Sequence, residues 1–129
     1  MAGPMAVQPS TVLVVDDEPS LRLLCRVNLE LDGHRVLEAA SVEAARELLG
    51  AGGVDVVLLD IQIGASSGLD LLDEIEAIEL PVRVVMLSGR SEISLQVRAR
   101  VDDVLGKPFH LEDLAAAVRG ERSGRLPDR

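Results

Sequence analysis

The chain alternates short apolar runs with longer stretches in which apolar residues recur every three or four positions. Short runs rich in Val, Ile and Leu are typical of strands buried in a parallel sheet, and the longer period is typical of amphipathic helices. The runs predict five strands, at residues 11–15, 35–39, 54–59, 82–87 and 101–105. The periodic stretches predict five helices, at residues 19–33, 41–50, 69–79, 92–100 and 110–119.

Several residues mark helix starts and inward faces. Pro19 suits a first helical turn because its missing N–H needs no partner there, and Ser41 has the side chain of a good N-cap. In the first helix, helical spacing predicts an inward face formed by Leu21, Leu24, Val27 and Leu31. In the second helix, the predicted inward residues are Ala44, Ala45, Leu48 and Leu49.

Strands that alternate with helices predict an α/β fold: a flavodoxin-like, doubly wound, five-stranded parallel sheet with five helices on its two faces. The expected strand order is 2-1-3-4-5. The expected organisation is a flexible leader at residues 1–10, one domain at residues 11–119 and a flexible tail at residues 120–129. In open parallel sheets of this kind, ligands bind at the carboxyl ends of the strands.

Chemically active side chains follow four of the five predicted strands. Asp16 and Asp17 follow the first strand, Asp60 the third, Ser88 the fourth, and Lys107, which is the only lysine, the fifth. Taken singly, each is explained by a helix cap or a turn. Together at one edge of a sheet, they predict a functional site.

The residue types indicate phosphoryl chemistry. Three carboxylates in one crevice repel one another, and a hard divalent cation such as Mg²⁺ balances them while keeping waters that a phosphate can replace. A carboxylate is also a nucleophile toward phosphorus. The phosphoryl oxygens need neutralisation during transfer, which the compact charge of Lys107 and the hydroxyl of Ser88 could supply together with the metal.

Composition argues against several other classes of protein. The 129 residues carry a net charge of −9 and one aromatic residue, Phe109, so a nucleic-acid surface built from cations or stacking rings is not expected. No apolar run reaches the ~20 residues of a membrane span, and the first residues lack a signal-peptide pattern. A cytoplasmic location is the expectation. Cys25, the only cysteine, is expected to be a buried, reduced thiol, whereas His34 and His110 are expected at the surface.

From Thr11 to about Arg119, the chain resembles the receiver domain of two-component response regulators, in the manner of single-domain chemotaxis regulators. The matching stretches are VLVVDDEPSLR, VDVVLLDIQI, GLDLL, VVMLSG and DDVLGKPF. The resemblance implies that Asp60 accepts a phosphoryl group from a sensor histidine kinase, a phosphotransfer protein or a small phosphodonor, with Mg²⁺ as the cofactor. It also implies that the Lys107–Pro108 peptide is cis, which a tertiary amide permits.

The resemblance implies a role for each of the other site residues. Asp17 matches a direct metal ligand, and Asp16 matches the acid that holds the metal through water. The backbone carbonyl of Gln62 would complete the metal ligands of the protein. Ser88 matches the hydroxyl that turns toward the phosphoryl group, and Lys107 matches the lysine that pairs with a phosphoryl oxygen.

The loop after Asp60 departs from the family pattern. Gly64 stands where a proline is usual, and Ser67 replaces the usual acidic or amide residue before Gly68. Glycine widens the choice of backbone conformations, so this loop is expected to be more mobile than in other members.

Three further positions bear on signalling. Val104 stands where an aromatic ring usually rotates to report phosphorylation, and a valine cannot do this. Gln62 and Arg90 are expected to border the site and to tune the lifetime of the phosphoryl group.

The leading hypothesis is therefore a phosphorylatable signalling module that acts by docking a partner protein, as a monomer or weak dimer. It is a phosphoacceptor rather than an enzyme. The alternative is a constitutive, phosphorylation-independent interaction module. An enzyme that binds a nucleotide or flavin ranks last, because the two carboxylates after the first strand would repel phosphate without a metal.

Overall fold

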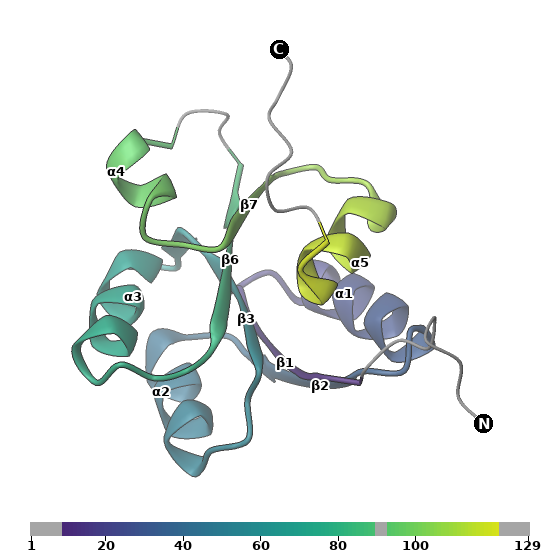
Figure 1. Cartoon of the computed structure of the whole chain (residues 1–129), viewed down its shortest axis with the longest axis horizontal. Helices are drawn as coiled ribbons and strands as arrows, with labels where there is room; N and C mark the ends of the chain where they lie inside the picture. The colour runs from purple at the N-terminus through teal and green to yellow at the C-terminus, as the bar shows by residue number, and fades with distance from the viewer. Residues whose placement is uncertain (1–8, 90–92, 122–129) are drawn as a thin grey trace.

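A five-stranded parallel sheet forms the centre of the computed structural model, which describes residues 9–89 and 93–121 (Figure 1). The strands are β1 (Thr11–Val15), β2 (Arg35–Ala39), β3 (Val56–Asp60), β6 (Arg83–Ser88) and β7 (Asp103–Gly106). Their order is β2-β1-β3-β6-β7. Because β6 and β7 are the fourth and fifth strands of this sheet, the predicted order and the flavodoxin-like fold are confirmed. The predicted leader and tail fall largely outside the described residues.

Helices cover both faces of the sheet. On one face lie α1 (Pro19–Leu31) and α5 (Leu111–Arg119), and on the other lie α2 (Val42–Ala51), α3 (Gly68–Ala77) and the short α4 (Leu95–Arg98) (Figure 1). Two short strands, β4 (Gln62–Ile63) and β5 (Ser66–Ser67), form an antiparallel pair where the sequence predicted only a loop. Among the described helices, none is long and apolar enough to cross a membrane.

Alternation along the strands divides the core into two layers. In β1, Leu13 and Val15 pack with residues of α2 and α3, whereas Val12 and Val14 pack with residues of α1 and α5. All four side chains are completely buried. Burial of one such side chain stabilises the fold by about 1.5–3 kcal/mol, so the central strands are held firmly from both sides.

The buried face of α1 differs from the predicted one. The four residues expected to point inward are half-buried or exposed: Leu21, Leu24, Val27 and Leu31. Cys25 and Leu29 face the core instead, and the prediction that Cys25 is a buried, unpaired cysteine is confirmed. Apolar residues surround most of this helix, so spacing alone does not select one face. Packing against β2 and α5 selects it.

The predicted face of α2 is confirmed. Ala45 and Leu49 are buried, and Ala44 and Leu48 are half-buried against the same core layer. The Ser41 hydroxyl accepts the Ala44 N–H at 3.1 Å, as expected of an N-cap.

The prediction for His34 is wrong, and the prediction for His110 is confirmed. His34 is only 4% exposed, and its Nδ1 atom accepts the Ser10 N–H at 3.0 Å. Ser10, directly before β1, contacts His34 across 24 positions of sequence, a contact that no local pattern reveals. His110 is exposed and occupies the N-cap position of α5.

Gly68, the first residue of α3, packs directly against the end of β3. A Cβ atom at this position would overlap the backbone carbonyl oxygen of Asp60 and would lie 3.2 Å from Cγ of Leu59. The Gly68 N–H also donates to the Ile61 carbonyl at 2.9 Å. The close approach of α3 to the strand that carries Asp60 therefore requires glycine here.

Gly68→Ala should lower the free energy of unfolding by about 2 kcal/mol, because the added methyl group forces backbone segments apart. Gly50→Ala is a matched control, since a Cβ at Gly50 in α2 meets nothing within 4 Å. The control should be neutral or stabilising by about 0.5 kcal/mol. Urea unfolding followed by circular dichroism measures both changes. Equal stability of the two variants would contradict the tight approach.

Candidate functional site

Four neighbouring strands place chemically active residues at one edge of the sheet. Asp16 directly follows β1, Asp60 ends β3, Ser88 ends β6 and Lys107 directly follows β7. The strands are neighbours in the order β1-β3-β6-β7. The structure therefore brings together the residues that the sequence placed at this edge, with Asp17 next to Asp16.

Three carboxylates form a cluster with the composition of a metal site. One carboxylate oxygen from each of Asp16, Asp17 and Asp60 lies within 4.8 Å of the other two. Asp16 is completely buried, Asp60 is 6% exposed and Asp17 is exposed. Because every candidate ligand atom is an oxygen, the set fits a hard divalent cation such as Mg²⁺ better than a soft metal.

Lys107 supplies a counter-charge to this cluster. Its Nζ atom lies 2.8 Å from Asp16 Oδ2 and 3.0 Å from Asp60 Oδ2. Burial works against the ammonium charge, but the hydrogen bonds to Asp16 and Asp60 outweigh burial, so the pKa of Lys107 is raised. One ammonium beside three carboxylates still leaves net negative charge, which favours the binding of a cation.

The surroundings of the Asp60 carboxyl group disfavour its ionised form. Burial raises the pKa of Asp60 above its usual range, and the charge of Asp16 adds to this effect. Hydrogen bonds from Lys107 and from the Gln62 N–H, the latter at 3.3 Å, oppose the rise without cancelling it. Positive charge brought to this carboxylate would therefore favour its ionised form.

Backbone N–H groups orient the other two carboxylates. The Glu18 N–H donates to Asp16 Oδ1 at 2.9 Å, and the Gly64 N–H donates to Asp17 Oδ2 at 2.9 Å. Gly64 has a φ of 59°. A proline in its place could not adopt that angle, and it has no backbone N–H to donate. The departure from the family pattern at Gly64 thus adds a hydrogen bond to Asp17. The expected mobility of this loop stays a prediction.

The β4–β5 pair borders the site on one side. Gln62 pairs with Ser67, and the Gln62 amide donates to the Gly64 carbonyl at 3.1 Å. Ser67 is also the N-cap of α3, where its hydroxyl accepts the Leu69 N–H at 3.1 Å. Arg90, which the sequence placed beside the site, lies outside the described residues.

Ser88 and Lys107 are linked on the opposite side. The Lys107 N–H donates to the Ser88 carbonyl at 2.6 Å, and Ser88 is only 2% exposed. The Lys107–Pro108 peptide bond is cis, as the family resemblance predicts. A crevice of about 510 Å³ opens between the two sides, lined by Asp60, Ile61, Gln62, Ser67, Ser88, Gly89 and Lys107.

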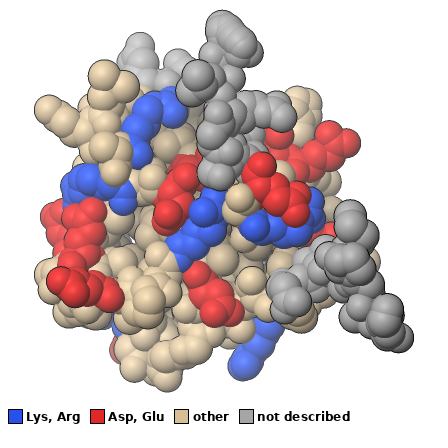
Figure 2. Space-filling model, viewed as in Figure 1, with Lys and Arg blue, Asp and Glu red and all other residues tan. Residues whose placement is uncertain are grey.

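Several charged side chains elsewhere on the surface form ion pairs. Acidic and basic side chains lie close together on the face shown in Figure 2. Arg100 contacts both Asp73 and Glu76 of α3, and Arg119 contacts Asp32 at 2.9 Å. These pairs at or near the surface contribute little stability individually.

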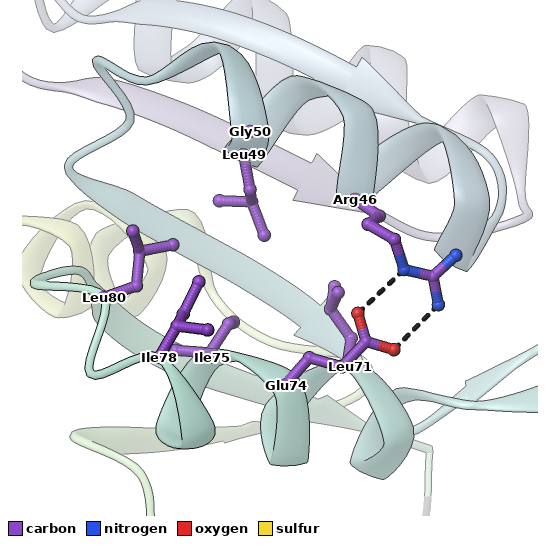
Figure 3. Close-up of a pocket in the computed structure, with 8 residues that line it drawn as sticks. All are labelled: Arg46, Leu49, Gly50, Leu71, Glu74, Ile75, Ile78 and Leu80. Atoms are coloured by element: carbon purple, nitrogen blue, oxygen red, sulfur yellow. Dashed lines mark hydrogen bonds and ion pairs between the residues drawn. The ribbon is translucent and has the colours of Figure 1, made fainter.

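A second hollow, of about 170 Å³, lies between α2 and α3 (Figure 3). Its lining is mainly aliphatic, from residues such as Leu49, Leu71 and Ile75. At its edge, the Arg46 guanidinium makes two hydrogen bonds to the Glu74 carboxylate, at 2.8 and 2.7 Å. Because these two charged groups satisfy each other, the hollow lacks the chemistry of the acidic crevice.

The sequence reasoning missed one residue at the acidic site, Arg22. Its Nη1 atom donates to the Asp16 carbonyl at 2.7 Å, and its Nε atom donates to Glu38 Oε1 at 3.0 Å. Arg22 closes the matching stretch VLVVDDEPSLR, so a signal was present in the sequence. The contacts themselves depend on β2 lying beside β1, which is a tertiary feature.

Comparisons with known proteins agree with this site. The sequence model of the response regulator receiver domain matches residues 12–119. The chain is 34% identical over 111 residues to the transcriptional regulatory protein KdpE of Mycobacterium tuberculosis. The match covers 84% of this chain and 49% of KdpE. The chain spans about half the length of the curated relatives it matches.

Two solved structures resemble the whole domain. The response regulator TrrA of Thermotoga maritima, in complex with Mg²⁺-BeF, has a TM-score of 0.78 at 30% identity and covers 85% of this chain and 96% of its own. A response regulator of Burkholderia pseudomallei with a phosphorylated aspartic acid, a calcium ion and citrate has a TM-score of 0.77 at 28% identity. The match covers 84% of this chain and 66% of that protein's chain. This chain belongs to the response regulator receiver family of two-component signalling. Members of this family are regulators rather than classical enzymes.

Asp60→Asn should stabilise the metal-free protein at pH 7. The folded protein has a raised Asp60 pKa, so its stability falls as the pH rises from the ordinary value of 3.8 through the folded value. Below 3.8, Asp60 is protonated in both the folded and the unfolded states, and the gain from the substitution should disappear. Urea unfolding in the presence of a chelator, at several pH values, measures this gain.

Glu47→Gln is the control, because Glu47 is an exposed carboxylate of α2 that does not line the crevice. Its effect should be small and should not follow the same pH profile. An Asp60→Asn protein that is less stable than the wild type at pH 7 would contradict the prediction. That result would mean that pairing with Lys107 outweighs the cost of burying the Asp60 charge.

Proposed function

We propose that this chain is a phosphorylatable signalling domain in which Asp60 accepts a phosphoryl group with the help of Mg²⁺. The observation that carries the proposal is the acidic cluster at the strand ends. Asp16, Asp17 and Asp60 gather oxygens within 4.8 Å, and Lys107 bridges Asp16 and Asp60. The cluster combines a nucleophile, a set of metal ligands and a neighbouring cation, and an open crevice is lined by Asp60 and Lys107.

The three carboxylates would hold the metal, together with the backbone carbonyl of Gln62. Bound there, Mg²⁺ supplies positive charge to the phosphoryl oxygens during transfer. The two solved relatives support this assignment, since one was determined with Mg²⁺-BeF and the other has a phosphorylated aspartic acid and a calcium ion.

In the transfer step, an Asp60 carboxylate oxygen forms a bond to phosphorus as the bond from phosphorus to the donor breaks. The leaving group keeps the electron pair of that bond and departs as neutral imidazole from a phosphohistidine whose other ring nitrogen is protonated, or as acetate from acetyl phosphate. Lys107, which already contacts Asp60 Oδ2, is placed to pair with a phosphoryl oxygen. The Ser88 hydroxyl lines the same crevice and would donate to another.

A sensor histidine kinase or a phosphotransfer protein would supply the phosphoryl group, and the phosphorylated domain would then dock a further protein. Val104 constrains how the signal spreads. It is half-buried in β7, opposite Met86 of β6, and packs against the α3 side of the core. Because valine has no ring to rotate, the signal would pass through the linked backbone of Ser88 and Lys107.

A constitutive interaction module is the second candidate function. The packed side chain of Val104 favours it, since the usual aromatic relay cannot operate in this chain. The complete set of strand-end residues weighs more heavily for phosphorylation, because a module that only binds a partner has no need of a buried nucleophile beside a lysine.

Incubation with acetyl phosphate and Mg²⁺ should add one phosphoryl group to the wild-type chain and none to Asp60→Asn. Intact-protein mass spectrometry measures the addition, and a chelator should abolish it. Asp70→Asn is the matched control, since Asp70 is an exposed carboxylate in the first turn of α3. It should be modified like the wild type.

Amide NMR shifts with beryllofluoride then separate two modes of signalling. Shifts that extend from Asp60 to Val104 and α5 would indicate a conformational switch that works without an aromatic ring. Shifts confined to the crevice would favour a phosphate relay. If neither mass nor shifts depend on Asp60, the phosphoacceptor proposal fails and the constitutive module takes its place.

A further inference from the structure

We propose that Arg22 is a positioning residue of the acidic site, which holds the turn that carries Asp16 and Asp17 in the geometry that a metal ion needs. This inference rests on the proposed Mg²⁺ site and adds a residue to it. Arg22 touches neither the metal position nor Asp60 in the described contacts. It acts through the backbone of Asp16.

The Arg22 guanidinium joins three segments of the fold. Arg22 belongs to the first turn of α1, where its own N–H donates to the Glu18 carbonyl at 3.2 Å. Its Nη1 atom donates to the Asp16 carbonyl at 2.7 Å, and its Nε atom pairs with Glu38 of β2 at 3.0 Å. The side chain is only 16% exposed, so these contacts are well shielded from water.

The Asp16 carbonyl lies where the pairing of β1 with β2 stops. The Asp16 N–H still donates to the Ala39 carbonyl at 3.1 Å, but β2 ends at Ala39. The carbonyl of Asp16 takes its donor from the Arg22 side chain instead. Residue 16 is thus fixed by its N–H on one side and by its carbonyl on the other. Because the Asp16 carbonyl belongs to the peptide group that joins Asp16 to Asp17, these bonds also fix the orientation of that peptide group.

The planar fork of arginine is essential to this arrangement. Two N–H groups of one rigid guanidinium point at two acceptors, a backbone carbonyl and a carboxylate. Glu38 supplies the carboxylate that pairs with this guanidinium. The edge strand β2, which has no residue in the crevice, contributes to the site through Glu38.

Arg26 provides a matched control for Arg22. It lies one helical turn further along α1, and its Nε atom pairs with the same carboxylate, Glu38, at 2.7 Å. Its backbone contact is to Val36, at 3.3 Å, rather than to Asp16. Arg22→Met and Arg26→Met therefore each remove one positive charge and one ion pair with Glu38. Only Arg22→Met releases the Asp16 carbonyl.

The test is a calorimetric titration of Mg²⁺ into the wild type and the variants, because the chain has no Trp or Tyr to report binding. Arg22→Met should weaken Mg²⁺ binding about 10-fold, the usual effect of losing a residue that orients metal ligands, and Arg26→Met should change it less than about 2-fold. Arg22→Lys should recover part of the loss, since lysine can satisfy one acceptor but not both.

A second readout separates positioning from general destabilisation. In the metal-free protein, the carbonyl ¹³C shift of Asp16 should move in Arg22→Met and stay in place in Arg26→Met. Urea unfolding of both variants shows whether their stabilities differ. If Arg22→Met does not fold, Arg22→Ala, which also removes the donor to the Asp16 carbonyl, carries the test, and wild-type affinity in that variant would overturn the inference.

The outcomes keep the two proposals apart. If the wild type fails to bind Mg²⁺, the proposed metal site is wrong whatever Arg22 does. If the wild type binds Mg²⁺ and the two methionine variants bind equally well or equally weakly, the positioning role of Arg22 is wrong and the metal site stands.

Discussion

Repulsion between three carboxylates at the ends of adjacent strands is the constraint on which this structure depends. Asp16 and Asp60 are buried, and Lys107 is the cation between them. Buried like charges are unfavourable unless other groups compensate them, so the rest of the fold has to hold them in place. The same imbalance makes the site receptive to a divalent cation and to the phosphoryl chemistry that such a cation assists.

Burial of the sheet on both faces offsets the unfavourable energy of the clustered carboxylates. Aliphatic side chains alternate between two core layers and fix the strands, and the strand ends fix the carboxylates. Fine positioning then comes from close backbone contacts. Gly68 lets α3 approach Asp60, Gly64 donates to Asp17, and Arg22 holds the carbonyl of Asp16. Stability resides mainly in the core, whereas the geometry of the site resides in these few polar and steric contacts.

Local sequence patterns predicted most of the fold and the membership of the site. Short apolar runs gave the strands, and the order of the sheet then placed Asp16, Asp60, Ser88 and Lys107 at one edge. These predictions succeeded because the types and spacing of neighbouring residues indicate which segments are buried strands and how strands alternate with helices. The same patterns failed for the inward face of α1, since a helix with apolar residues on most sides has no unique periodic solution.

The sequence by itself determined the family, the order of the strands and the identity of the residues at the acidic edge. Only the tertiary structure decided how those residues are held. The hydrogen bond from Ser10 to His34, the Gly64 N–H on Asp17 and the contacts of Arg22 with Asp16 and Glu38 all join segments distant in sequence or separated by a turn. Such contacts depend on the distance between packed elements, and residue periodicity contains no information about that distance.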